Sequence, residues 1–343
     1  MTAAGCKGSV PFYRPEEVRA ALDYDGCIAA VRTAMAEFSA DGRPQPLRSI
    51  YEIAPDKFFG LMPGTLTAPH GFGAKLLSVF ADPAQPGRSA HRGVVVLFDR
   101  ETGEVTCIAD AGEVTEIRTA AASAVATGVL ARRDARTLAI FGCGLQATSH
   151  IRALVRVREL EEILVWGRSV DRAARFAEQM QRDVAVRIRA VKEARDAASS
   201  ADIICTVTGS PTPVLLGEWV RPGTHVNAVG SSRAGPVEID HALVLASRYI
   251  VDSRRSALAA AAEFLLAKQA GLIDDSHIVA EIGEVLLGRV PGRRSPEEIT
   301  VYKSLGHIVQ DLAAVSYLHA RAGAVDRMRD GVPSGGGLTP EAG

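Results

Sequence analysis

The sequence predicts an α/β protein in which a Rossmann-type, doubly wound parallel sheet is joined to a second α+β domain with a mainly antiparallel sheet. Three observations predict this fold. An apolar strand at 137–141 runs directly into a glycine motif and a helix-compatible segment. Strand and helix candidates alternate from there to about residue 252, as they do in parallel sheets with crossover helices. Before residue 110, several strand candidates follow one another without helices between them, which favours antiparallel pairing.

Length and composition are those of an ordinary globular enzyme. The 343 residues suffice for about two domains, and 47% of them are hydrophobic and 23% charged. The net charge of −1 gives no electrostatic reason to expect binding to nucleic acid or to an anionic membrane. The chain begins without a long apolar segment and has no run of about 18 apolar residues. We therefore expect a cytoplasmic protein that is neither secreted nor inserted in a membrane.

The cysteines agree with a reducing compartment. There are five of them, an odd number, with no C-x-x-C spacing: Cys6, Cys27, Cys107, Cys143 and Cys205. This pattern favours free thiols over a disulfide scaffold or a zinc site, and we expect no bound metal.

In the first part of the chain, residues 15–41 predict one helix that ends at Asp41-Gly42. The prolines at 44 and 46 then start an extended segment at 47–53. Four further strands are predicted, at 58–62, 73–80, 93–99 and 105–109. A long alanine-rich helix at 115–131 then carries the chain into the second domain.

The second domain is predicted to contain six parallel strands, at 137–141, 162–166, 184–190, 202–207, 224–229 and 248–252. Further helices are expected at 257–270, 278–287 and about 302–321. The tail from Gly331 is rich in glycine and proline and is expected to be disordered.

The central motif has the form G-x-G-x-x-A and consists of Gly142, Cys143, Gly144, Leu145, Gln146 and Ala147. The first glycine permits a tight strand-to-helix turn, and the second lets the backbone approach a pyrophosphate. The small third residue lets the helix pack on its strand, so that the N-terminal amides of the helix face the phosphates. A tight turn without a ligand remains the alternative, but the flanking strand and helix favour a dinucleotide site.

The end of the second strand indicates which dinucleotide is preferred. An NAD site usually places an acidic residue there, to accept from the ribose 2′-hydroxyl. This chain instead has Gly167, Arg168 and Ser169, and a guanidinium suits a 2′-phosphate. Ser169 is also a natural helix N-cap, a role compatible with phosphate binding. We expect NADP(H) to be preferred, with NAD(H) as the alternative.

Other cofactor contacts are expected where further strands end, because ligands bind at the carboxyl edge of such sheets. Thr206, Val207 and Thr208 end one strand, and Val229 and Gly230 end the next. Ordinary loop packing is the alternative for each of these residues.

The chain resembles the ornithine cyclodeaminase/μ-crystallin family over nearly its whole length. The segments that carry the resemblance are PLR at 46–48, GAKLLSVF at 73–80, LFDRETGEV at 97–105, EVTEIRTAAASAVAT at 113–127, FGCGLQA at 141–147, VWGRS at 165–169, VNAVGSSRAGPVEID at 226–240 and EIGEVLLGRVPGRRSPEEITVYKSLGHIVQDLAA at 281–314. The resemblance implies enzymes that move a hydride between a nicotinamide and the α-carbon of an amino or imino acid. It also implies a homodimer built through the first domain, to which the last helix returns. We accordingly expect a substrate-binding and dimerisation domain at 1–125 and 306–330, and a dinucleotide-binding domain at 126–305.

By the same resemblance, the cations that bind the substrate carboxylate fall on Arg48, Lys75 and Arg118. A carboxylate in a dry cleft does need opposite charge, because burying an unpaired charge is costly. Taken singly, Lys75 or Arg118 would be better explained as a surface or snorkelling cation, and the surrounding motifs favour the carboxylate role. Lys75 and Arg118 are the expected catalytic pair, with Lys75 or a bound water as the proton donor. Ser304, Gly306 and His307 are expected near the nicotinamide, although His307 could simply start a helix.

The chain departs from the cyclodeaminases at Ser232, where the resemblance would place an aspartate that handles the substrate amine. Serine cannot act as a carboxylate base, so ammonia elimination loses its best candidate catalyst. We therefore expect Ser232 to contact substrate in an NADPH-dependent reductase of small imino or 2-oxo acids, or in an amino-acid dehydrogenase. A cyclodeaminase with bound NAD, a non-catalytic NADPH-dependent binding protein and an opine-like condensing enzyme are the alternatives.

Overall fold

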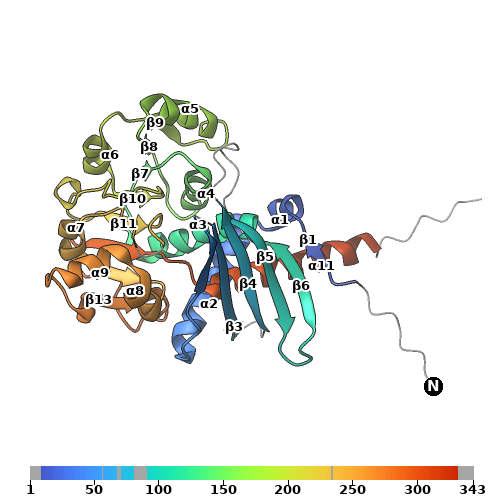
Figure 1. The fold of residues 1–343 in the computed structure, drawn as a ribbon. Helices are drawn as coiled ribbons and strands as arrows, with labels where there is room; N and C mark the ends of the chain where they lie inside the picture. The colour runs from blue at the N-terminus through green and yellow to red at the C-terminus, as the bar shows by residue number, and fades with distance from the viewer. Residues whose placement is uncertain (1–8, 56, 68–70, 81–90, 233–234, 331–343) are drawn as a thin grey trace, which may run out of the picture.

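The computed structural model describes residues 9–55, 57–67, 71–80, 91–232 and 235–330. These residues form two sheets that lie beside each other, each with its own helices (Figure 1). The predicted disordered tail at 331–343 lies outside the described residues. Among the described residues, no helix is both long and apolar enough to cross a bilayer.

The first sheet has six strands in the order β1-β6-β5-β4-β3-β2. The strands are β1 (Phe12–Tyr13), β2 (Ser49–Ala54), β3 (Lys57–Leu66), β4 (Gly71–Phe80), β5 (His91–Asp99) and β6 (Val105–Asp110). Neighbours from β2 to β6 pair antiparallel, as predicted, and β1 joins β6 in parallel.

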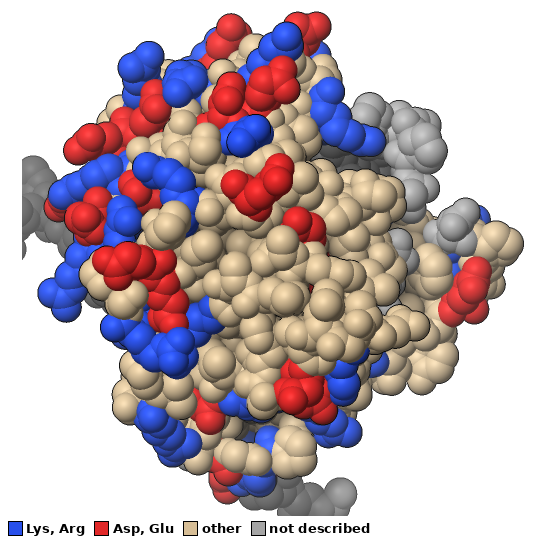
Figure 2. Space-filling view, turned by 90° about the vertical axis from the view of Figure 1, so that its left-hand side faces the viewer, with Lys and Arg blue, Asp and Glu red and all other residues tan. Residues whose placement is uncertain are grey.

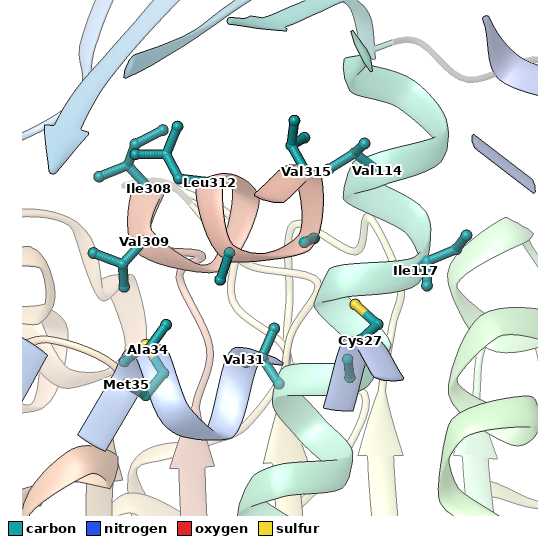
Figure 3. Close-up of a cluster of buried hydrophobic side chains, with 14 of the residues drawn as sticks. Cys27, Val31, Ala34, Met35, Val114, Ile117, Ile308, Val309, Leu312 and Val315 are labelled. Atoms are coloured by element: carbon teal, nitrogen blue, oxygen red, sulfur yellow. The ribbon is translucent and has the colours of Figure 1, made fainter. Parts of the chain in front are cut away.

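Two helices, α3 (Ala111–Leu130) and α11 (Ile308–Asp330), cover one face of this sheet, and α2 (Tyr24–Asp41) packs on both of them. Figure 3 shows how their apolar side chains meet: Val309 of α11 points toward Ala34 and Met35 of α2, whereas Leu312 lies on the opposite side of α11, toward the sheet. The burial of this apolar surface holds α11, which is distant in sequence, against the first sheet.

The second sheet has eight strands, all parallel, in the order β13-β12-β14-β11-β10-β7-β8-β9. The strands are β7 (Thr137–Phe141), β8 (Glu162–Trp166), β9 (Arg187–Ala190), β10 (Ile203–Thr206), β11 (His225–Ala228), β12 (Ser247–Val251), β13 (Ile278–Glu281) and β14 (Ile299–Lys303). Helices that include α4 (Leu145–Leu154), α5 (Val170–Met180), α6 (Ala194–Ser200) and α7 (His241–Ala246) cross over between them. The predicted fold class, a Rossmann sheet beside a mainly antiparallel one, is confirmed.

The six predicted parallel strands were too few, because β13 and β14 were missed. Residues 278–287 were predicted as one helix, but Ile278 and Ala280 pair with β12, and α10 (Ile282–Leu286) begins only afterwards. The helix predicted from about 302 starts six residues later. Residues 299–303 form β14, and Gly306, with φ of +80°, turns the chain before α11.

Two other predicted helices are interrupted. The helix expected at 15–41 divides into α1 (Pro15–Ala21) and α2, because Asp23 caps α2 by accepting from the Gly26 amide at 2.8 Å. The helix expected at 257–270 divides into α8 (Arg254–Ala260) and α9 (Ala262–Gln269).

The helix α3 packs against both sheets. It contacts β5 on one side, and Thr127 on the other accepts a hydrogen bond at 2.9 Å from Asn227 of β11. The helix α3, which carries Arg118, is therefore shared by the two sheets. The boundary between the two domains, expected at residues 125 and 126 within this helix, stays a prediction.

On the face of the molecule shown in Figure 2, acidic and basic side chains intermingle along the top and left, while the centre is largely uncharged. No continuous basic stripe is visible on this face. Its charge pattern therefore does not indicate a nucleic-acid-binding surface.

Candidate active site

The glycine turn joins β7 to α4 at the carboxyl edge of the parallel sheet. Gly142 has φ of +131°, and a Cβ there would lie 2.9 Å from the carbonyl oxygen of Val207. Gly144 is the N-cap of α4 and makes no side-chain cap, and a Cβ there would meet nothing within 4 Å. Ala147 is fully buried, which lets α4 lie close to its strand. The uncapped amides of Leu145 and Gln146 therefore leave a cradle that fits a pyrophosphate.

The ends of β10 and β11 are tied together by a carboxylate that the sequence did not reveal. Oε2 of Glu238 accepts from the Thr206 hydroxyl at 2.8 Å and from the Gly230 amide at 2.6 Å. Its Oε1 accepts from the Thr208 amide at 2.6 Å and from the Thr208 hydroxyl at 2.7 Å. Thr206 and Thr208, both predicted as cofactor contacts, thus fix the loops after β10 and β11 through Glu238. Gly230 is needed here because a Cβ on it would lie 2.0 Å from the Thr208 carbonyl oxygen.

The end of β8 lies against the glycine turn. A Cβ on Gly167 would lie 2.8 Å from the sulfur of Cys143, and the Arg172 guanidinium donates to the Cys143 carbonyl at 3.2 Å. Ser169 caps α5 by accepting from the Arg172 amide at 3.3 Å, and Arg168 is exposed beside it. The guanidinium groups of Arg168 and Arg172 therefore both lie near the end of β8.

A buried cation cluster lies between the two sheets. Lys75 comes from β4, Arg118 from α3 and Asp311 from α11. Oδ1 of Asp311 accepts from Lys75 Nζ and from Arg118 Nε, each at 3.0 Å. Lys75 also donates to the Thr115 hydroxyl at 2.6 Å, and Arg118 to Oε1 of Gln310 at 2.9 Å. Lys75 and Arg118 thus lie close together, as predicted. The carboxylate that joins them in the structure is that of Asp311.

Arg48 reaches the same region from the segment that precedes β2. Its guanidinium donates to the carbonyl oxygens of Ser232 at 3.1 Å and Gly306 at 3.2 Å, and also to that of Leu305. The three carbonyls belong to loops that follow β11 and β14. Arg48 therefore bridges the first sheet to the carboxyl edge of the second, and Ser232 meets it through its backbone.

The turn after β14 is shaped by Asp252 and Arg118. Oδ2 of Asp252 accepts from the amides of Leu305 at 2.8 Å and Gly306 at 2.7 Å. A Cβ on Gly306 would lie 2.9 Å from Nη1 of Arg118, so the absence of a side chain makes room for the guanidinium. The hydroxyl of Ser304 is buried and has no hydrogen-bond partner among the described residues.

His307 is buried and its ring packs on Phe38, with centroids 4.4 Å apart. Burial, aided by the nearby Arg48 and Arg118, lowers its pKa to about 4, so the imidazole is neutral at pH 7. It directly precedes α11, and its Nδ1 accepts from the Val309 amide at 3.5 Å. His307 therefore stands at the start of α11, beside the cation cluster.

Electrostatics distinguish Lys75 from an ordinary lysine. Burial lowers the pKa of Lys75 to about 8, although Asp311 opposes the shift. Burial alone would raise the pKa of Asp311, but Arg118 and Lys75 outweigh it and hold that pKa below its ordinary value. The Asp311 Oδ2 atom is buried without a partner among the described residues. The cluster therefore contains an amine that can exchange a proton near neutral pH.

Sequence reasoning missed several members of this site: Thr115, Asp252 and Gln310, with Asp311 noticed only as a neighbour of His307 on one helix face. Thr115 could have been found, since it lies three residues before Arg118 on the same helix face. Asp252 and Gln310 carry no local signal. Among the described residues, no group of three or more His, Cys, Asp or Glu side chains could hold a metal ion.

A glycine turn at the edge of a parallel sheet, together with a buried cation cluster beside the loops that follow β11 and β14, defines an NAD(P)-dependent oxidoreductase. More particularly, the chain belongs to the ornithine cyclodeaminase/mu-crystallin family, whose model matches residues 12–325. The resemblance read from the sequence is thus confirmed.

Known relatives are similar over nearly the whole chain. A Delta(1)-pyrroline-2-carboxylate reductase of Bacillus cereus is 35% identical over 308 residues, which are 89% of this chain and 94% of that protein. The structure of the Thermococcus litoralis Delta(1)-pyrroline-2-carboxylate reductase with NADH and L-proline superposes with a TM-score of 0.88 at 30% identity, covering 92% of this chain and 98% of that one. An archaeal alanine dehydrogenase dimer with bound NAD has a TM-score of 0.86 at 28% identity, covering 92% and 97%.

The lowered pKa of Lys75 predicts a pH-dependent stability. The folded protein releases the Lys75 proton at about pH 8, whereas an unfolded lysine holds it to 10.5, so unfolding takes up a proton between these values. Rising pH therefore stabilises the folded state through this group, by up to about 1.4 kcal/mol per pH unit. In urea denaturation from pH 7 to 10, Lys75→Met should lack this contribution relative to the wild type. The exposed Lys192→Met should retain it; parallel wild-type and Lys75→Met profiles would contradict the prediction.

Proposed function

We propose that this protein reduces the carbon–nitrogen double bond of a small cyclic imino acid such as Δ1-pyrroline-2-carboxylate, with NADPH as the hydride donor. The observation that carries the proposal is the charge balance of the buried cluster. Three cations, Arg48, Lys75 and Arg118, face two carboxylates, Asp252 and Asp311, which leaves one positive charge. A buried unpaired charge is costly, so the site favours a ligand with one negative charge.

This charge balance discriminates between substrates. A cyclic imino acid with a neutral nitrogen carries only its carboxylate and neutralises the cluster. A zwitterionic amino acid brings no net charge, and a diamino acid such as ornithine adds a positive one. With serine at position 232 there is also no carboxylate to receive the amine of a diamino acid. The balance therefore supports imine reduction over ammonia elimination.

In the proposed mechanism the two arginines, Arg48 and Arg118, hold the substrate carboxylate and orient its imine carbon. Lys75, with its pKa near 8, donates a proton to the imine nitrogen, because an iminium is the better hydride acceptor. Asp311 and Thr115 hold Lys75 through the hydrogen bonds described above. The dinucleotide, when bound, supplies the hydride.

The preference for NADPH is supported by the end of β8. No acidic side chain stands where β8 ends, and Arg168 and Ser169 are exposed there next to Arg172. A guanidinium can bind two phosphate oxygens at once. It has no acceptor atom, so a ribose hydroxyl cannot donate a hydrogen bond to it as it would to a carboxylate. The two relatives with solved structures described above contain NADH and NAD, so this preference would distinguish the present chain from those two proteins.

We also propose a homodimer formed through the outer face of the first sheet. The helices lie on the other face, behind the strands in Figure 1. The strand register places these side chains on the outer face: Leu61, Pro63, Phe72, Ala74, Leu76, Val94, Val96 and Phe98. Such a contiguous apolar face is typical of an interface, and the archaeal alanine dehydrogenase is a dimer. The free thiols of Cys27, Cys107, Cys143 and Cys205 support a cytoplasmic location.

The proposal is tested by following NADPH oxidation with Δ1-pyrroline-2-carboxylate, and with pyruvate plus methylamine, while ornithine is assayed for ammonia release. The wild type should reduce the cyclic imine fastest and release no ammonia. Arg118→Ala should lower kcat/KM at least 100-fold, about 3 kcal/mol, because a hydrogen-bonded charge pair is lost. Its affinity for NADPH, measured by fluorescence titration, should stay within about twofold. Ammonia from ornithine, or an active Arg118→Ala, would refute the assignment.

Cofactor choice is tested by Arg168→Ala. Removing a guanidinium that pairs with the 2′-phosphate should raise the Kd for NADPH about 10- to 100-fold and leave that for NADH nearly unchanged. Isothermal titration with both dinucleotides measures the two constants. Arg175→Ala, at an exposed arginine of the following helix α5, is the control; an equal loss for both dinucleotides would argue against the assignment.

The dimer is tested by Phe72→Arg. Phe72 stacks on Phe98 with centroids 5.0 Å apart, and a charge there would be buried unpaired in the interface. In sedimentation velocity the wild type should run as a dimer of the 36.3 kDa chain, and the variant as a monomer. Leu266→Arg, at an exposed apolar position on α9, should remain dimeric. A monomeric wild type would refute the proposal.

A further inference from the structure

A second buried ion pair lies behind the candidate active site, and the proposed chemistry does not use it. Lys303 is the last residue of β14, and Glu263 lies in the first turn of α9. Lys303 Nζ lies 3.0 Å from Oε2 of Glu263, and both side chains are fully buried. The hydrogen bonds of both groups are directed to each other and to the loop after β11, away from Lys75 and Arg118.

Both members of the pair hold Ser231, in the loop that follows β11. Lys303 Nζ donates to the Ser231 carbonyl at 2.6 Å and to its hydroxyl oxygen at 2.5 Å. The Ser231 hydroxyl in turn donates to Oε1 of Glu263, which also accepts from the Glu238 amide at 3.2 Å. A side chain from β14 is therefore cross-linked to the loop after β11.

The next residue, Ser232, connects this network to the cation cluster. Its carbonyl accepts from Arg48, whose other contacts are the carbonyls of Leu305 and Gly306 in the turn after β14. The same two segments are thus joined twice, once by Lys303 and once by Arg48. If Ser231 moved, Arg48 would lose one of the three carbonyls that fix its guanidinium.

Stability does not account for a pair of charges at this place. A buried ion pair commonly gives no more stability than apolar residues of similar volume, because desolvation offsets the attraction. What the pair provides is a fixed position for the loop, since three hydrogen bonds from its two side chains converge on Ser231.

We propose that Lys303 and Glu263 are positioning residues, which fix Ser231 so that the Ser232 carbonyl holds Arg48 in the substrate-binding cluster. The effect on substrate binding through Arg48 rests on the proposed function. The effect on the position of Ser231 and its loop does not. The two parts are therefore measured separately.

The informative variant is the double substitution Lys303→Met/Glu263→Leu, which removes both charges and leaves neither unpaired. Hydrogen exchange of the Gly230 amide reports on the loop, because this amide bonds to Thr206 and Glu238 and to neither substituted residue. Its exchange should be at least tenfold faster than in the wild type, while amides of β7 are unchanged. The urea midpoint should equal or exceed that of the wild type.

In the imine-reduction assay, the double variant should show a KM for the imino acid at least tenfold higher, a smaller fall in kcat, and a Kd for NADPH within about twofold. Glu263→Gln, which keeps an acceptor for Ser231, should give an intermediate KM and serves as the test if the double variant does not fold. Lys268→Met removes an exposed lysine from the same helix and should change nothing. Wild-type Gly230 exchange and wild-type KM in a folded variant would overturn the proposal. Faster Gly230 exchange in a protein whose wild type reduces no imine would refute the proposed function and leave the positioning role supported.

Discussion

The shared carboxylate oxygen of Asp311 is the interaction on which the candidate site depends. Lys75 and Arg118 repel each other, and they can be buried together only because Oδ1 of Asp311 lies 3.0 Å from both. One carboxylate cannot neutralise two cations, and Arg48 adds a third to the same region. With Asp252 also counted, one positive charge is left over, and the preference for an acid that we propose would follow from this incomplete neutralisation.

The fold makes this arrangement possible by bringing three distant segments onto one face of the first sheet. Lys75 stands on β4, Arg118 on α3 and Asp311 on the first turn of α11, and the apolar side chains in Figure 3 pack α3 and α11 against that sheet. Below them the carboxyl ends of β11 and β14 supply the loops that Arg48 bridges. The candidate site therefore lies where two layers of different architecture meet, which is a common place for a ligand site.

Much of this arrangement could be predicted from sequence, and the failures have physical reasons. The strand at 137–141 and its glycine turn were predicted correctly because a buried parallel strand is continuously apolar and the turn needs glycine at 142. Lys75 and Arg118 could be named because they are charged residues within apolar segments and match a family pattern. Arg48 could be named from the family pattern alone. Strand β13 was taken for a helix because four apolar-rich residues next to a helix have no distinct period. Asp252 and Glu238 were missed because their roles come from tertiary hydrogen bonds, which leave no trace in local spacing.

The return of α11 to the first sheet also affects the order of events during synthesis. Arg48 and Lys75 leave the ribosome early, but the carboxylate that lets Lys75 and Arg118 be buried together is 193 residues further along than Arg118. Until that residue emerges, the nascent chain carries two adjacent cations without their partner, and the sheet face that α11 covers is open to solvent. All eight strands of the parallel sheet are translated before the first sheet acquires its last helix. Translation of α11 is thus the step that completes the cation cluster.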